Sequence, residues 1–172
     1  MTEKPDVLET PIAAQHGSFA TGNGALMIAA LFLPFIQVCD NSHITGAEMI
    51  QFPPITSSAV VALLSVWAGL HLLVSNRPQL GVEMIRSTLA GFGGTVLLVL
   101  GLPALIEGGA DELRIGYWLF LAGNVAVVFQ VGALLSAAAP ERRKPWVILS
   151  GLAAAMALVF SAWTIIINLM ET

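Results

Sequence analysis

Residues 115–139 read IGYWLFLAGNVAVVFQVGALLSAAA, a run without Asp, Glu, Lys or Arg. An α-helix rises about 1.5 Å per residue, so roughly 20 apolar residues cross the hydrocarbon core of a bilayer. The run is long enough to do so. It predicts a membrane-spanning helix over Ile115–Ala139.

Uncharged runs of similar length recur along the chain. Together with the first they are Ala20–Val38, Ile55–Ser75, Ser87–Ile106, Ile115–Ala139 and Trp146–Met170. All seven Lys and Arg residues and all eleven Asp and Glu residues lie in the connections and tails. We predict an all-α transmembrane bundle of five spans, with residues 1–19 as a polar cytoplasmic tail and residues 20–170 as a single domain. Pro34 interrupts the first run, and the bundle has four spans if that run does not cross.

The composition excludes several classes of protein. Hydrophobic residues make up 56% of the 172 residues and charged residues 10%, whereas a soluble domain carries roughly 25% charge. A water-soluble globule and a disordered chain are both excluded. The net charge of −4 comes without a basic stripe, so nucleic acid is not an expected partner. The single Cys cannot form an internal disulfide.

The basic residues predict the orientation. With the N-terminus inside, every Lys and Arg except Arg114 lies on the inner face, as the positive-inside rule requires. The C-terminus is then outside. Pro140–Pro145 connects the last two spans and is short enough to make them an antiparallel hairpin.

Neutral polar residues inside the spans have two possible roles. These residues are Gln37, Asn124, Gln130 and Asn168. They serve either as interhelical hydrogen-bonding groups or as the lining of a solute path. Asn124 and Gln130 are six positions apart and point about 120° away from each other, so the pair cannot line a narrow pore together.

Candidate ligands are sparse. His71 is the one ionisable residue inside the predicted spans, where it acts as a proton or haem ligand or as an interfacial imidazole. Cys39, Asp40 and His43 form the densest cluster, but a structural zinc site needs four ligands. We therefore favour a polar turn, closed by Thr45 and Gly46, and expect neither metal nor cofactor.

Small residues repeat at helical spacing in two spans. The predicted packing residues are Ser87, Gly91 and Gly94 in one span and Gly151 and Ala155 in the last. Such rows let helix backbones approach closely. The spans contain no Ser-His-Asp order, no His-Glu-x-x-His motif and no facing pair of carboxylates, so we expect no enzymatic activity.

Three short segments carry a resemblance. Residues 31–39 (LFLPFIQVC), the later Thr45-Gly46 pair and residues 116–119 (GYWL) resemble a loose group of small uncharacterised bacterial multi-pass membrane proteins. The resemblance implies the bacterial inner membrane and no known activity. We expect an accessory or scaffold subunit that packs against other membrane subunits or against its own copies in the lipid bilayer. The alternative is a passive channel or small-solute carrier.

Overall fold

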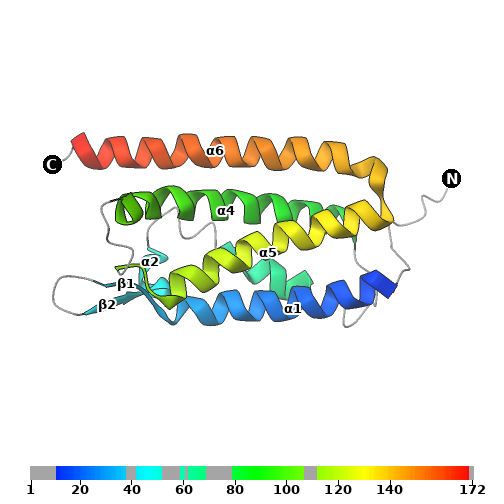
Figure 1. Cartoon of the computed structure of the whole chain (residues 1–172), viewed down its shortest axis with the longest axis horizontal. Helices are drawn as coiled ribbons and strands as arrows, with labels where there is room; N and C mark the ends of the chain where they lie inside the picture. The colour runs from blue at the N-terminus through cyan, green and yellow to red at the C-terminus, as the bar shows by residue number, and fades with distance from the viewer. Residues whose placement is uncertain are drawn as a thin grey trace.

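The computed structural model describes residues 11–37, 42–51, 59–60, 62–68, 79–106 and 112–170. Its long helices are α1 (Pro11–Leu31), α4 (Leu80–Ile106), α5 (Ile115–Ala138) and α6 (Arg143–Met170), and residues 59–60 and 62–68 are also helical. The long helices lie along one common direction, with α5 crossing between α1 and α4 (Figure 1). The fold is all-α, as predicted.

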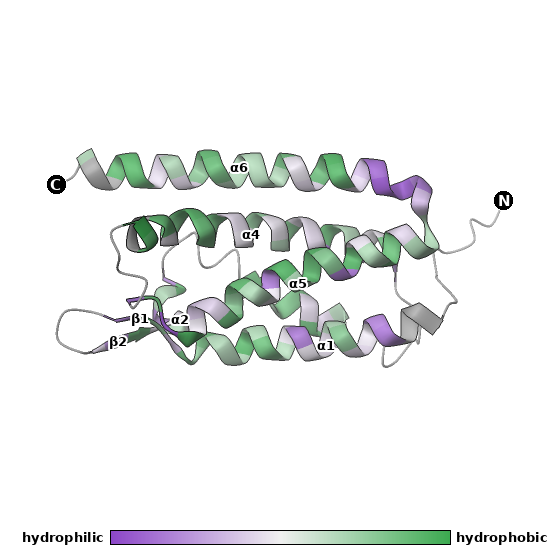
Figure 2. Cartoon of the chain, viewed as in Figure 1, coloured by the Kyte–Doolittle hydropathy of each residue, from purple (hydrophilic) through white to green (hydrophobic). Residues whose placement is uncertain are grey.

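Three of the described helices are long and apolar enough to cross a membrane. These candidate spans are Leu80–Leu102, Ile115–Ala138 and Pro140–Ile167, and the colouring by hydropathy shows them as mostly hydrophobic (Figure 2). α1 is not among them, because polar residues such as Gln15, His16 and Asn23 interrupt its apolar sequence. Most of the predicted span Ile55–Ser75 lies outside the described residues.

The boundaries predicted for the first span are wrong. The helix begins at Pro11, inside the predicted tail, and ends at Leu31. Proline has no backbone N–H and disfavours helical geometry in the residue before it, so Pro34 prevents continuation. The chain instead forms β1 (Pro34–Gln37), which pairs antiparallel with β2 (His43–Thr45).

A capping box follows this hairpin at the start of α2 (Gly46–Met49). The Thr45 N–H donates to Glu48 Oε2 at 2.7 Å, and the Glu48 N–H donates to Thr45 Oγ1 at 3.3 Å. The backbone and hydroxyl donors of Thr45 hold the pKa of the Glu48 carboxyl below its usual value. The polar turn predicted to close at Thr45 and Gly46 is therefore part of a strand-to-helix junction.

The later helices match their predicted ranges more closely, with one consequential exception. α5 and α6 begin and end within a few residues of the predicted bounds. α4 begins at Leu80, so it includes Glu83 and Arg86, which lie outside the predicted span Ser87–Ile106 and were expected in the connection or in one extra helical turn at the membrane surface.

The short connection does reverse the chain between α5 and α6, through a 3-10 turn at Pro140–Arg142. The two helices nevertheless separate beyond this turn. α6 packs mainly along α4 and contacts α5 little, and it lies on the outside of the molecule (Figure 1). The last helix therefore has one face against the bundle and one face without a neighbour among the described residues.

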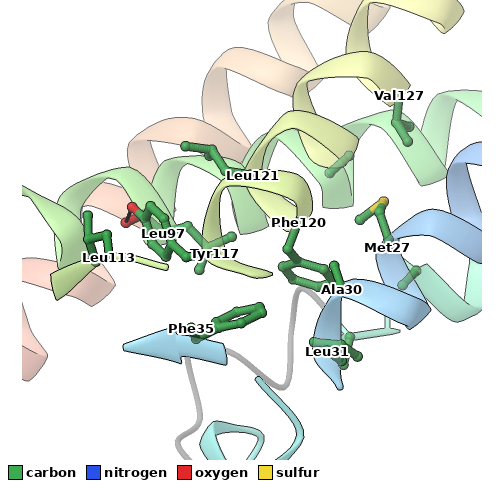
Figure 3. Packing of buried hydrophobic residues seen from close by; sticks show 13 residues of the cluster. Met27, Ala30, Leu31, Phe35, Leu97, Leu113, Tyr117, Phe120, Leu121 and Val127 are labelled. Atoms are coloured by element: carbon green, nitrogen blue, oxygen red, sulfur yellow. Dashed lines mark hydrogen bonds between the residues drawn. The ribbon is translucent and has the colours of Figure 1, made fainter. Parts of the chain in front are cut away.

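An aromatic cluster joins the hairpin to the helices (Figure 3). The ring of Phe35 in β1 lies 6.4 Å from that of Tyr117 and 5.8 Å from that of Phe120, between ring centroids. Gly116 permits this approach, because a Cβ at that position would lie 2.8 Å from the Pro34 carbonyl oxygen and 2.9 Å from that of Ala30. Close packing of α1, β1 and α5 thus depends on the missing side chain.

Candidate functional site

A buried charged cluster lies near the beginnings of α1 and α4. It consists of His16 from α1, Ser65 from the helical segment 62–68, and Glu83 and Arg86 from α4. Each of these residues is no more than 5% exposed. Glu83 and Arg86 belong to a candidate membrane span, where ionisable side chains are rare and are functional candidates by default.

One carboxylate oxygen organises the cluster. Glu83 Oε2 accepts hydrogen bonds from Arg86 Nε at 3.0 Å and from Arg86 Nη2 at 2.6 Å. The same oxygen lies 2.7 Å from His16 Nε2. Arg86 Nη1 donates to Ser65 Oγ at 3.2 Å. The guanidinium therefore neutralises the carboxylate and also reaches α1 and the helical segment 62–68.

Because the cluster is buried, the pairing of its charges matters for the stability of the fold. Removing charges from water costs several kcal/mol per ion, and the cost is offset only where opposite charges meet with satisfied hydrogen bonds. Glu83 and Arg86 meet that condition on one helix, at i and i+3. His16 and Ser65 extend the network to two other segments. The arrangement joins three segments of the bundle at one end.

A second polar link anchors α6 beside this cluster. Trp146 Nε1 donates to Ser87 Oγ at 2.6 Å, and the Ser87 hydroxyl donates to the Met84 carbonyl at 2.9 Å. The edge of the Trp146 ring also covers Gly132 of α5, where a Cβ would lie 3.2 Å from the ring. Ser87, a predicted packing residue, thus connects α4 to the start of α6.

Sequence reasoning missed the charged cluster because it placed helix boundaries where charges begin. The available signal was the i, i+3 spacing of Glu83 and Arg86, which puts an acid and a base on one helix face. His16 carried no signal of its own. Its partner lies 67 residues away in the sequence, and no local pattern reports such a contact.

Gly91 and Gly94 of α4 face α5. A Cβ at Gly94 would lie 3.4 Å from Asn124 Cβ, and one at Gly91 would lie 3.9 Å from a methyl of Val128. Both glycines line a shallow groove of about 190 Å³ between the two helices. A methyl group fits at either position, whereas a longer side chain would enter the α4–α5 contact or fill the groove.

The small residues of α6 lie on two different faces. Ala157 and Ser161 are fully buried, whereas Gly151 and Ala155 are exposed. No described atom lies within 4 Å of a Cβ built on Gly151. Within the part of the chain that the structure describes, the predicted packing residue Gly151 therefore has no helix to pack against, and Ala155 is exposed.

The neutral polar residues do not gather along one path. Gln37 is half-buried in β1, at the hairpin end of the bundle. Asn124 is fully buried in α5 and donates to its own helix, at the Phe120 carbonyl, over 2.9 Å. Gln130 Oε1 and Asn124 Oδ1 are buried and have no hydrogen-bond partner among the described residues. The side chain of Asn168 lies outside the described residues.

The predicted ligand residues fall mostly outside the described residues, as Cys39, Asp40 and His71 all do. His43 is described and exposed, on β2. In the described ranges, no group of three or more His, Cys, Asp or Glu side chains is arranged to hold a metal ion.

Known proteins offer no guide to this site. No protein-family model, curated protein or solved structure matches the chain. Its function has to be argued from the geometry of its own residues.

Proposed function

We propose that the chain is a non-enzymatic, multi-pass accessory or scaffold subunit of the bacterial inner membrane, which packs against helices of a larger membrane complex. One observation carries the proposal. α6 is held to the molecule by a single face, and its opposite face is apolar and without a neighbour in the described chain along nearly its whole length (Figure 2).

The shape of that outer face suits a helix. Gly151 and Ala155 are one turn apart and leave the backbone accessible. Beside them lies a groove of about 710 Å³, lined by Leu152, Ala155, Met156, Val159, Phe160, Ala162, Trp163 and Ile166. Helices in lipid associate through close van der Waals packing at small residues, because hydrophobic burial supplies no drive between them.

The charged cluster supports a structural role. Glu83 and Arg86 are paired with each other and hydrogen bonded to His16 and Ser65. A transported ion or a substrate would need an accessible charged partner, and these groups are almost completely buried. The cluster instead fixes one end of the bundle, which favours a rigid platform for partners.

A passive channel or small-solute carrier is the second candidate. It is favoured by two buried amide oxygens that have no hydrogen-bond partner within the described ranges, Asn124 Oδ1 and Gln130 Oε1. Asn124 lines the groove of about 190 Å³ between α4 and α5, but Gln130 does not, so the two amides do not line that groove together. Solute flux from liposomes that contain the purified chain, lost in Asn124→Leu and Gln130→Leu, would establish the channel in place of the scaffold.

The proposed subunit has five spans with its N-terminus inside and its C-terminus outside. Periplasmic and cytoplasmic reporter fusions test this orientation. Fusions after Pro54 and Thr172 should report the outside and a fusion after Pro140 the inside, because all basic residues except Arg114 then face inward. If the N-terminal tail also reports the outside, α1 does not cross and the number of spans is four.

Assembly through α6 is tested by co-purification in a mild detergent. Gly151→Leu and Ala155→Leu should each reduce the recovered complex about tenfold, which corresponds to roughly 1.4 kcal/mol of lost packing. Gly81→Leu and Ala122→Leu are matched controls, since both positions are exposed and lie on other helices. Wild-type recovery of both α6 variants would mean that this face contacts lipid, and the proposal would fail.

A further inference from the structure

A small cleft lies at the end of the bundle opposite the charged cluster. It has a volume of about 330 Å³ and is lined by Pro34, His43, Arg114 and Ile115. Its walls come from both strands of the hairpin and from the start of α5. Two of its lining residues are basic, although acidic residues predominate in the neighbouring connections.

Arg114 is fixed by its backbone, and its side chain has no partner among the residues that the structure describes. Its N–H donates to the Phe35 carbonyl at 2.8 Å, and its own carbonyl accepts from the Tyr117 N–H at 3.1 Å. Nε is buried without an acceptor, and the guanidinium forms no hydrogen bond or ion pair with any described residue. A guanidinium presents five N–H donors in a fixed fork, and shielded donors without acceptors are costly.

Other features of the cleft also favour a negative ligand. Arg114 is the N-cap residue of α5, a helix of 24 residues, and the first amide groups of a helix lack partners within it and carry partial positive charge. His43 adds a ring nitrogen from β2. The nearby carboxylate of Glu48 is already bonded to the backbone and hydroxyl of Thr45. The Glu112 side chain is exposed.

The position of Arg114 at the end of a candidate span favours one class of anion. Arg114 directly precedes the candidate span Ile115–Ala138, and the partly exposed Trp118 one turn further donates its Nε1 to the Leu113 carbonyl. Tryptophan at the end of a span is typical of the headgroup layer. We propose that the Arg114–His43 cleft binds a phosphate oxyanion, either from a phospholipid headgroup or from free phosphate, through the guanidinium fork and the imidazole.

The test measures binding to the purified full-length chain. Native mass spectrometry counts retained phosphatidylglycerol, and ³¹P line broadening follows inorganic phosphate in lipid-free detergent. Arg114→Gln should weaken binding at least about tenfold, as expected for loss of a charge-assisted bidentate contact, and His43→Gln should weaken it less. Arg143→Gln is the control, because Arg143 is exposed at the start of α6, outside the cleft.

Each outcome decides between sources or rejects the site. Lipid retention that depends on Arg114, without phosphate broadening, supports a headgroup ligand. Broadening that depends on Arg114 supports free phosphate. Equal binding by wild type and Arg114→Gln in both assays, or equal loss in Arg143→Gln, overturns the proposal. Arg114→Lys retains the charge without the fork and replaces Arg114→Gln if the latter does not fold. The site is independent of α6, so its failure leaves the proposed assembly role untouched.

Discussion

Replacing Arg86 with methionine should lower the free energy of unfolding by about 3–5 kcal/mol. The substitution leaves the Glu83 carboxylate buried without its cation and removes the donor to Ser65 Oγ. For a chain of this size the loss corresponds to a decrease of about 6–20 °C in the thermal midpoint. The midpoint is measured by intrinsic tryptophan fluorescence in detergent.

A double variant separates lost charge pairing from lost packing. Arg86→Met combined with Glu83→Met should be more stable than Arg86→Met alone, because it removes the uncompensated carboxylate and keeps much of the side-chain volume. Arg143→Met is the matched control, since Arg143 is exposed and should leave the midpoint nearly unchanged. An Arg86→Met variant with the wild-type midpoint would show that the cluster does not hold the bundle together.

The parts of the fold that were predicted correctly follow from local chemistry. Ile115–Ala138 is uncharged and mostly apolar, and it has a charged residue at one end and a proline beyond the other, so its helix could be predicted almost to the residue. Pro34 also acts locally, but its effect was misjudged. We expected the first span to continue past Pro34 to Val38, whereas the helix ends at Leu31 and the chain then forms a strand.

The parts that were missed depend on contacts between distant residues. Glu83 and Arg86 can be buried within α4 because they neutralise each other and reach His16 and Ser65 from other segments. A hydropathy scale scores each charged residue by itself, so it predicts that both Glu83 and Arg86 lie at the surface. The Arg114–His43 cleft is similar, because its two basic residues are brought together by the β-hairpin, which the sequence pattern did not predict.

The second large effect is expected at Gly24, where α1 crosses the helical segment 62–68. A Cβ there would lie 2.6 Å from the Val66 backbone nitrogen and 2.9 Å from the Ser65 carbonyl carbon. These are backbone atoms of a helical segment, so they cannot rotate away as a side chain would. Gly24→Leu should therefore cost about 3 kcal/mol or more through overpacking, again measured as the thermal midpoint in detergent.

α1 cannot relieve the clash by moving without breaking other contacts. Asn23 Nδ2 donates to the Gly123 carbonyl of α5 at 2.9 Å, and His16 lies two turns earlier on the same helix, against Glu83. A shift of α1 would lengthen both the Asn23–Gly123 hydrogen bond and the His16–Glu83 contact. Gly24→Leu and Arg86→Met should consequently lower the midpoint by less than the sum of their separate effects, because both weaken the contacts of α1 with its neighbours.

Gly22→Leu is the control for Gly24→Leu, since Gly22 is exposed with no described atom within 4 Å of its Cβ position. Equal midpoints for the Gly22 and Gly24 variants would mean that α1 does not pack against this segment in the membrane.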